Sequence, residues 1–260
     1  MERNKIYNME CIAGMSGLPP RSVDMILCDL PYGVTDCQWD KLLPLNQLWE
    51  QYLRIIKEDG AIVLTACQPF TTQLIMSQRK LFRYCWYWRK NCPTGFANAK
   101  RQPLRCIEDV VVFYRRPGTY HPQGLRRLET PLEKKAAPKA GGVYKAGTLN
   151  KPHIQEFTGY PRNLLEVPCE RGLHPTQKPA ALFEYLVRTY TNPGELVLDN
   201  CMGSGTTAVA CIRSGRDYLG FELDPHYCAV AQRRAEKERE ESTRCPVNPN
   251  TPASTPDAAP

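Results

Sequence analysis

Two apolar runs in this chain each end at an acidic residue and continue at once into a turn, and this pattern constrains the fold more than any other feature. Residues 23–28 lead into Asp29, Leu30, Pro31 and Tyr32, and residues 195–198 lead into the glycine-rich stretch 199–207. Similar apolar runs alternate with segments of helical periodicity. Strands that alternate with helices predict an α/β fold with a mainly parallel sheet, in which ligands bind at the carboxyl ends of the strands.

The pattern divides the chain into four parts. Residues 1–115 and 166–240 hold the alternating elements, residues 116–165 lack periodicity, and residues 241–260 are rich in proline and are expected to form a disordered tail. Strands are predicted at 23–28, 61–65, 82–88, 109–114, 195–198 and 217–221. Helices are predicted at 45–57, 69–78, 179–190, 205–214 and 225–240.

Basic residues are concentrated in the middle of the chain. Of 34 Lys and Arg and 27 Asp and Glu, residues 79–162 hold 18 and 5, a local charge of +13, whereas the remainder carries −6. A basic middle in a mildly acidic scaffold favours a surface for a polyanion such as nucleic acid. The alternative is a solvated, lysine-rich insertion without a partner.

The cysteines and the apolar segments indicate in which cellular compartment the protein is expected. The 12 cysteines are scattered and form no CxxC pair, so we expect neither a disulfide framework nor a structural metal site. The first ten residues are charged and lack an apolar signal core. No apolar run approaches the roughly 18 residues of a membrane span. A reduced, cytoplasmic setting is expected.

The glycine-rich turn at residues 199–207 lets a ligand approach the backbone closely, and the helix after it offers free amides. Glu222 ends the next predicted strand, where an acid can accept hydrogen bonds from both hydroxyls of a ribose. The turn lacks the GxGxxG spacing and the GK[ST] sequence, which disfavours a dinucleotide and a nucleoside triphosphate. The alternative is a tight turn followed by a helix-capping acid.

The first turn offers two hydrogen-bond acceptors side by side, the Asp29 carboxylate and the Leu30 carbonyl. Together they can hold both hydrogens of a planar –NH₂ group, and Tyr32 supplies an aromatic face for a base. The alternative is an Asx-Pro turn.

The sequence HPTQKP at 174–179 is open to two interpretations as well. Thr176 and Pro179 can start the following helix, or Thr176, Gln177 and Lys178 can lie near a ligand carboxylate.

Taken together, DLPY, HPTQKP and DNCMGSGTT resemble, in sequence and order, the motifs of the beta group of DNA N6-adenine and N4-cytosine amino-methyltransferases. The resemblance covers roughly residues 3–235, except 117–162. It implies a Rossmann-like class I methyltransferase fold with a seven-stranded sheet and a circularly permuted motif order. Residues 1–115 are then the catalytic half, 116–165 a target-recognition insertion and 166–240 the cofactor-binding half.

The resemblance also implies roles for individual residues. Asp29, Leu30, Pro31 and Tyr32 are expected to hold a flipped base in double-stranded DNA, with adenine favoured over cytosine because the motif begins with Asp. S-adenosylmethionine is the expected cofactor, and Glu10 and Cys11 are expected near its adenine. The expected cofactor-binding set is Glu10, Cys11, Asp29, Thr176, Lys178, Asp199, Cys201, Gly203, Ser204, Gly205, Thr206 and Glu222.

Two departures from the family pattern stand out. Leu30 replaces a proline but keeps the backbone carbonyl, and Cys201 replaces a phenylalanine expected to pack on the cofactor. DNA contacts are expected from Arg89, Lys90, Arg101, Arg126, Arg127, Lys134 and Lys135, with His121, Gln123 and Asn150 as further candidates for base edges. The alternatives are an N4-cytosine enzyme, an RNA methyltransferase, and a non-catalytic DNA-binding protein with this fold. A monomer and a homodimer are both compatible with the sequence.

Overall fold

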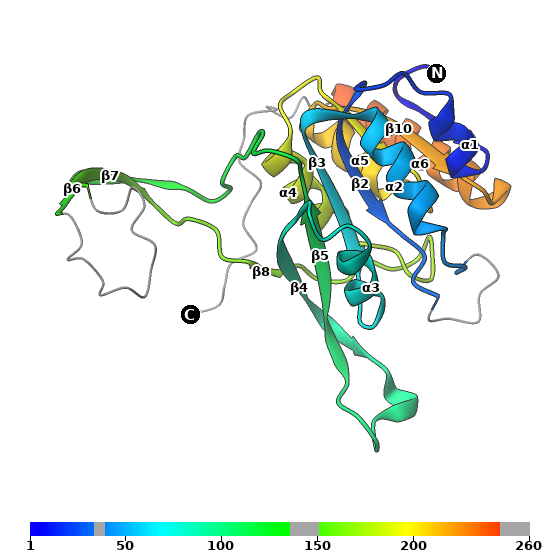
Figure 1. The fold of residues 1–260 in the computed structure, drawn as a ribbon, viewed down its shortest axis with the longest axis horizontal. Helices are drawn as coiled ribbons and strands as arrows, with labels where there is room; N and C mark the ends of the chain where they lie inside the picture. The colour runs from blue at the N-terminus through cyan, green and yellow to red at the C-terminus, as the bar shows by residue number, and fades with distance from the viewer. Residues whose placement is uncertain (34–39, 136–150, 245–260) are drawn as a thin grey trace.

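The computed structural model describes residues 1–33, 40–135 and 151–244. Its main strands are β1 (Lys5–Asn8), β2 (Val23–Asp29), β3 (Ile56–Ala66), β4 (Phe82–Thr94), β5 (Arg105–Phe113), β8 (Leu164–Glu166), β9 (Leu196–Asp199) and β10 (Asp217–Glu222). The helices are α1 (Cys11–Ser16), α2 (Leu45–Ile55), α3 (Phe70–Ser77), α4 (Ala180–Tyr190), α5 (Thr206–Ser214) and α6 (Pro225–Arg244), with a 3-10 turn η1 (Phe96–Asn98). Figure 1 shows their arrangement.

The eight strands form one sheet in the order β1-β10-β9-β2-β3-β5-β4-β8. Neighbours are parallel except at β3–β5 and β5–β4, which confirms the mainly parallel α/β prediction. The predicted count of seven strands is wrong, because the three-residue strand β8 pairs with β4 and adds an edge. Such a short strand has too few residues to produce a periodic signal.

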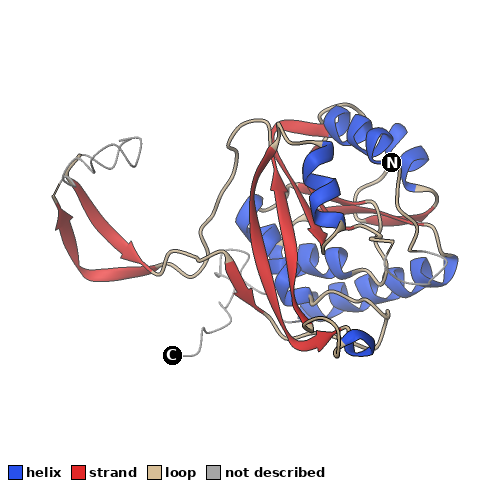
Figure 2. Ribbon diagram, turned by 60° about the horizontal axis from the view of Figure 1, so that its bottom comes forward, coloured by secondary structure: helices blue, strands red, loops and turns tan. Residues whose placement is uncertain are grey.

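Helices cover both faces of the sheet, and β2 shows why (Figure 2). Successive side chains of a strand point to opposite faces. Met25 and Leu27 pack in a core cluster with residues of α4, α5 and α6. Ile26 and Cys28 pack in a second cluster with residues of α1, α2 and α3. A strand buried on both faces has a continuous apolar sequence rather than an alternating one, as residues 23–28 do.

Two hairpins project from this body (Figure 1). In the first, Asp109 of β5 pairs with Ala66, the last residue of β3, so residues 89–107 extend beyond the carboxyl edge of the sheet. We call this segment the β4–β5 arm. The second is a separate antiparallel pair, β6 (Arg126–Lys134) and β7 (His153–Thr158), which we call the β6–β7 arm.

The structure differs from the predicted elements in several places. Strand β1 and helix α1 were not predicted, and β3, β4 and β5 are longer than the strands predicted at 61–65, 82–88 and 109–114. The β6–β7 arm lies within a region predicted to be irregular, because its strands are exposed along most of their length and have no buried face. Helix α6 continues to Arg244, past the predicted start of the tail, and residues 245–260 lie outside the described residues. Within the described part of the chain, no helix is both long and apolar enough to cross a membrane.

Candidate active site

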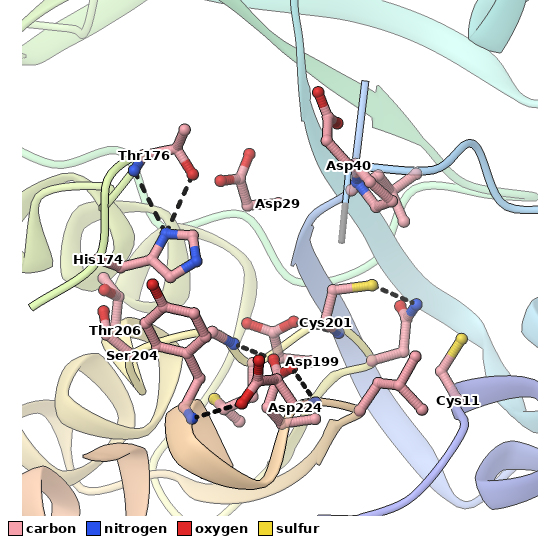
Figure 3. A pocket seen from close by; sticks show the side chains of 18 of the residues that line it. Cys11, Asp29, Asp40, His174, Thr176, Asp199, Cys201, Ser204, Thr206 and Asp224 are labelled. Atoms are coloured by element: carbon pink, nitrogen blue, oxygen red, sulfur yellow. Dashed lines mark hydrogen bonds between the residues drawn. The ribbon is translucent and has the colours of Figure 1, made fainter. Parts of the chain in front are cut away.

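The two acid-ended turns open on one cavity. Strands β2 and β9 are parallel neighbours, with Met25 opposite Val197 and Ile26 opposite Leu198, so their carboxyl ends share an edge. The cavity there has a volume of about 550 Å³, a size typical of sites for small ligands. Its wall includes nearly all predicted catalytic and cofactor-binding residues: Glu10, Cys11, Asp29, Leu30, Pro31, Tyr32, Thr176, Lys178, Asp199, Cys201, Gly203, Ser204, Thr206 and Glu222. Figure 3 shows Asp29 and Asp199 in the same pocket.

The Asp29 carboxylate is held by three donors. Its Oδ1 accepts hydrogen bonds from the Tyr32 hydroxyl at 2.7 Å and from the Thr65 hydroxyl. Its Oδ2 accepts one from Lys178 Nζ at 2.8 Å. Tyr32 stacks on Phe70 with ring centroids 5.6 Å apart, and burial, followed by the Asp29 charge, raises the pKa of the Tyr32 hydroxyl well above its usual range. The carboxylate orientation is therefore fixed before any ligand binds.

Lys178 lines the predicted cavity, but its ammonium group is directed at Asp29. The sequence interpretation placed this group near a ligand carboxylate. Its side chain is 6 % exposed, and a buried ammonium group needs counter-charges, which Asp29 and Glu108 supply. Burial lowers the pKa of Lys178, but these two carboxylates outweigh it, and the net shift is upward. The group therefore belongs to the ion pairs around Asp29.

Glu108 of β5 extends these ion pairs to the root of the β4–β5 arm. Its Oε2 lies 3.3 Å from Lys178 Nζ, and its Oε1 lies 2.9 Å from Lys90 Nζ. The predicted DNA contact by Lys90 is thus not supported, because the Lys90 side chain is only 7 % exposed and is paired with Glu108. Burial raises the pKa of Glu108, but the two lysines outweigh it and the net shift is downward.

Asp199 lines the same cavity and is 2 % exposed. Its Oδ1 accepts a hydrogen bond from the Cys201 amide at 3.0 Å, and its Oδ2 accepts one from the Thr207 hydroxyl. Burial raises the pKa of Asp199 to about 7 although these hydrogen bonds oppose the shift. A cationic group in the cavity would favour the ionised form of this carboxyl.

Two further acids are fixed by backbone amides at the cavity wall. Glu222 Oε2 accepts from Gly203 N at 2.7 Å, and Glu222 Oε1 accepts from Asp224 N at 2.9 Å. Glu10 caps α1 by accepting from Ile12 N and Ala13 N. Each carboxylate retains acceptor capacity on the side away from these amides. Both acids are therefore oriented for a ligand with hydroxyl or amine donors.

Gly205 is the predicted cofactor residue that does not line the cavity. It precedes α5 with φ of 84°, and a Cβ atom there would lie 3.0 Å from Ala231 Cα in α6. Its glycine is required for the turn and for the close approach of α6.

Thr176 does line the cavity but does not cap α4, because its amide and hydroxyl face His174 Nδ1 and the Ala180 amide bonds Glu170 instead.

Exposed basic side chains lie along both arms. Arg101 is exposed on the β4–β5 arm, and Arg89, also exposed, pairs with Glu166 at 2.7 Å. On or beside the β6–β7 arm, the exposed predicted residues are Arg126, Arg127, Lys134 and Lys135. Of the candidates for base edges, Gln123 is 7 % exposed, His121 is hydrogen bonded to Asn192, and Asn150 lies outside the described residues. Gln123 is thus not available as a surface contact.

Comparison with known proteins assigns the family. The sequence profile of a DNA methylase family, N6_N4_Mtase, matches residues 23–233. The chain belongs to this family of DNA methylases. Its relatives include the type II methyltransferase M1.MboII of Moraxella bovis, 26 % identical over 87 % of this chain and 94 % of the relative. The DNA adenine methyltransferase YhdJ of Escherichia coli (strain K12) is 27 % identical over 90 % of this chain and 83 % of YhdJ.

A third relative is YubD of Escherichia coli (strain K12), which is named provisionally as a methylase. YubD is 44 % identical over 86 % of this chain and 87 % of its own length. Among solved structures, the M1.HpyAVI–SAM complex has a TM-score of 0.59 at 24 % identity and covers 88 % of this chain and 98 % of that chain. The cytosine-N4-specific PvuII DNA methyltransferase has a TM-score of 0.62 at 15 % identity, with 91 % of each chain covered. These similarities confirm the predicted family and the class I methyltransferase fold.

Sequence reasoning missed Thr65 and Glu108 in the site of this methylase. Thr65 is directly opposite Asp29 in the β2–β3 register, so the strand alignment places its hydroxyl on the carboxylate. Glu108 immediately precedes the run Asp109–Phe113 that forms the buried end of β5. Asp29, Asp199 and Glu222 were identified because each is an acid at the carboxyl end of a buried strand. Glu108 lies at the same edge of the sheet, but β5 is antiparallel, so the acid comes before the buried run and not after it.

Proposed function

We propose that this DNA methylase transfers a methyl group from S-adenosylmethionine to the N6 amine of an adenine that has flipped out of double-stranded DNA. The observation that carries the proposal is the position of Asp29. Its carboxylate and the neighbouring Leu30 lie in the same cavity as the loop of Gly203 and Glu222. An acceptor pair for an amine thus faces a loop suited to a nucleoside-containing methyl donor.

The residues of the cofactor side fit S-adenosylmethionine, which supplies an electrophilic methyl group when bound. Glu222 has a carboxylate oriented by two amides and would accept the ribose hydroxyls. Asp199 would hold the methionine ammonium group, because a buried carboxyl with a raised pKa gains from a cationic partner. Glu10 and Cys11 would lie near the adenine. The hydroxyls of Thr176 and Ser204 would supply donors for the carboxylate of the cofactor, whereas the Thr206 hydroxyl donates to the Lys178 carbonyl.

The acceptor capacity of Asp29 matches an incoming amine. A carboxylate oxygen can accept two hydrogen bonds. Oδ1 accepts from Tyr32 and Thr65, whereas Oδ2 accepts from Lys178 and keeps one position. One amine hydrogen would bond to that position and the other to the Leu30 carbonyl, and Tyr32 would supply the face for the base. Flipping the base costs about a few kcal/mol, and the preset geometry contributes by holding the nitrogen in a reactive position.

Adenine is proposed as the target for two reasons. The motif begins with Asp and ends with Tyr, as in the N6-adenine members that it resembles, and YhdJ is named as an adenine methyltransferase. An N4-cytosine amine would fit the same pair of acceptors, and the PvuII enzyme has a similar fold. Chemical identification of the product distinguishes the two.

The arms are proposed to bind the DNA. The β4–β5 arm extends from the same edge of the sheet as Asp29, and both arms carry exposed basic residues. Contacts to phosphates from Arg101 and Arg89 on one arm, and from Arg126, Arg127, Lys134 and Lys135 on the other, would position the duplex over the cavity.

The proposal is tested with purified protein, tritiated S-adenosylmethionine and unmethylated DNA. Digestion of the DNA to nucleosides should place the label in N6-methyladenine, and sequencing of DNA from expressing cells should give the site. Asp29→Asn keeps the size of the side chain but removes one carboxylate oxygen, so transfer should fall by about 100-fold or more with cofactor binding retained.

Asp217→Asn is the matched control, because Asp217 also pairs with a basic residue, Arg3, but lies at the beginning of β10, whereas only the far end of that strand, Glu222, lines the cavity. It should leave the transfer rate unchanged. Label in N4-methylcytosine would replace adenine by cytosine as the target. Cofactor binding with no transfer to any DNA would support a non-catalytic DNA-binding protein and overturn the proposal.

A further inference from the structure

Glu108 has one oxygen atom that the ion pairs described above do not satisfy. The Oε2 atom is fully buried, and among the described residues no donor is aligned to form a hydrogen bond with it. Lys178 Nζ is 3.3 Å away, an ion-pair distance, but its hydrogen bond goes to Asp29 Oδ2. Buried carboxylate oxygens in folded proteins are nearly always hydrogen bonded, so an unsatisfied one calls for an explanation.

Two lysines, Lys90 and Lys178, pair with the Glu108 carboxylate and stabilise its ionised form. Its other oxygen accepts from Lys90 at 2.9 Å, and both side chains are largely buried. Lys178 thus lies between two carboxylates, hydrogen bonded to Asp29 and paired only by charge with Glu108. An ammonium group has three protons, and a rotation of the terminal torsions of Lys178 is enough to align one of them with Glu108 Oε2.

The proposed reaction changes the charge and the hydrogen bonds at Asp29 Oδ2, where Lys178 donates. Asp29 Oδ2 must accept a hydrogen from the amine of the base, and the amine nitrogen gains positive charge as its new bond to carbon forms. Oδ2 has a second acceptor position for the amine, but an ammonium group that remains bonded to this oxygen would repel that developing charge. Asp29 therefore acts best if Lys178 has a second acceptor close by.

We propose that Glu108 is a positioning residue that takes over the hydrogen bond of Lys178 when the base amine docks on Asp29. Lys178 moves its donor from Asp29 Oδ2 to Glu108 Oε2, which leaves Asp29 to the amine and keeps the cation away from the reacting nitrogen. Lys90 holds the other oxygen of Glu108 throughout. This inference rests on the proposed function, since it concerns methylation of an amine held by Asp29.

The test measures kcat and KM for Glu108→Gln, which keeps the size of the side chain but removes its charge. The full-length protein is assayed with S-adenosylmethionine and a duplex that contains its methylation site. We expect kcat to fall by about 10- to 100-fold while KM for both substrates changes by less than about twofold. Asp217→Asn, which loses an ion pair outside the site, should show wild-type kcat.

A double variant separates positioning from a structural role. If Glu108 acts through Lys178, Glu108→Gln adds no further loss of kcat to Lys178→Met. Multiplying losses would overturn the proposal, as would wild-type kcat in Glu108→Gln. If Glu108→Gln does not fold, Glu108→Asp keeps the charge but shortens its reach. Reduced kcat in that variant, with unchanged KM and thermal stability, would support the proposal, and wild-type kcat would refute it.

The wild-type assay separates this inference from the proposed function. If the wild-type protein methylates DNA and the Glu108 variants match it, only the positioning role fails. If the wild-type protein transfers no methyl group to an amine of DNA, both fail.

Discussion

Lys178 donates a hydrogen bond of 2.8 Å to Asp29 although 149 positions separate the two residues in the chain. The contact joins the last residue of β2 to the segment that leads into α4, and both side chains are largely buried. The Asp29 carboxylate therefore has a cationic partner from a distant part of the chain. The consequences of this contact can be measured.

Lys178→Met should destabilise the fold and slow transfer. Removing one partner of a buried ion pair costs about 3 kcal/mol, because Asp29 and Glu108 would then face each other without the cation between them. Chemical denaturation measures the loss, and the transfer assay measures kcat. Lys178→Arg, which retains the charge, should recover most of the stability. A Lys178→Met protein as stable as the wild type would contradict the assigned ion pair.

Gly205→Ala should lower stability more than Gly203→Ala. Both positions have positive φ, which costs a residue with a Cβ about 1 kcal/mol. At Gly205 the new Cβ also meets Ala231 Cα at 3.0 Å, whereas at Gly203 the nearest atom is 4.0 Å away. We expect a total loss of about 2–3 kcal/mol at Gly205. Equal unfolding free energies for the two variants would show that α6 moves freely to accommodate the methyl group.

Cofactor affinity should depend on pH through Asp199. The pKa of this carboxyl is about 7 because of burial, so it is largely protonated below that pH. Ionised Asp199 is the form that would hold the methionine ammonium group. Binding should therefore release a proton, and affinity should fall by up to about tenfold per pH unit as the pH drops below 7. The expected control, Asp199→Asn, binds more weakly at pH 8 and shows a flatter profile. Calorimetry in buffers of different ionisation enthalpy measures the proton release directly.

Arg101→Ala should weaken DNA binding uniformly across sequences. A phosphate contact contributes through release of a counterion, so the slope of log K against log salt should decrease in magnitude by about 1. Arg233 is exposed on α6, away from both arms, and Arg233→Ala should leave the slope unchanged. Fluorescence anisotropy over a salt series measures both. The same slope for Arg101→Ala and the wild type would remove the β4–β5 arm from the DNA interface.

The convergence of Asp29 and Gly203 was predictable because each follows a strand that is apolar on both faces. Such strands belong in the middle of a parallel sheet, and a parallel sheet brings their ends to one edge. Glu10 and Cys11, which also line the cavity, were expected from the family resemblance and not from these two strand ends. The β6–β7 arm was not predictable in this way. Its apolar residues Leu132 and Ile154 are exposed, so the arm has no buried face and its sequence has no alternation of apolar and polar residues.

The partners of individual charges were not predictable. Lys178 lies in a motif that also suits a helix start, and nothing local indicates that its ammonium group reaches Asp29 rather than a ligand. Lys90 belongs to the basic middle of the chain, and only the pairing of β4 with β5 shows that it is buried on Glu108. Composition locates charge in a segment, but the register of strands decides which charges meet solvent.

The pairing of β2 with β9 has a consequence for biosynthesis. The Leu196 amide bonds to Asp24 across 172 positions, so a nascent chain on the ribosome completes β2 long before its neighbour exists. Until β9 emerges, one side of β2 has no strand to pair with, and Asp29 has no Gly203 turn across the cavity. The cavity at the shared edge of the two strands therefore forms only after β9 and the Gly203 turn have been synthesised.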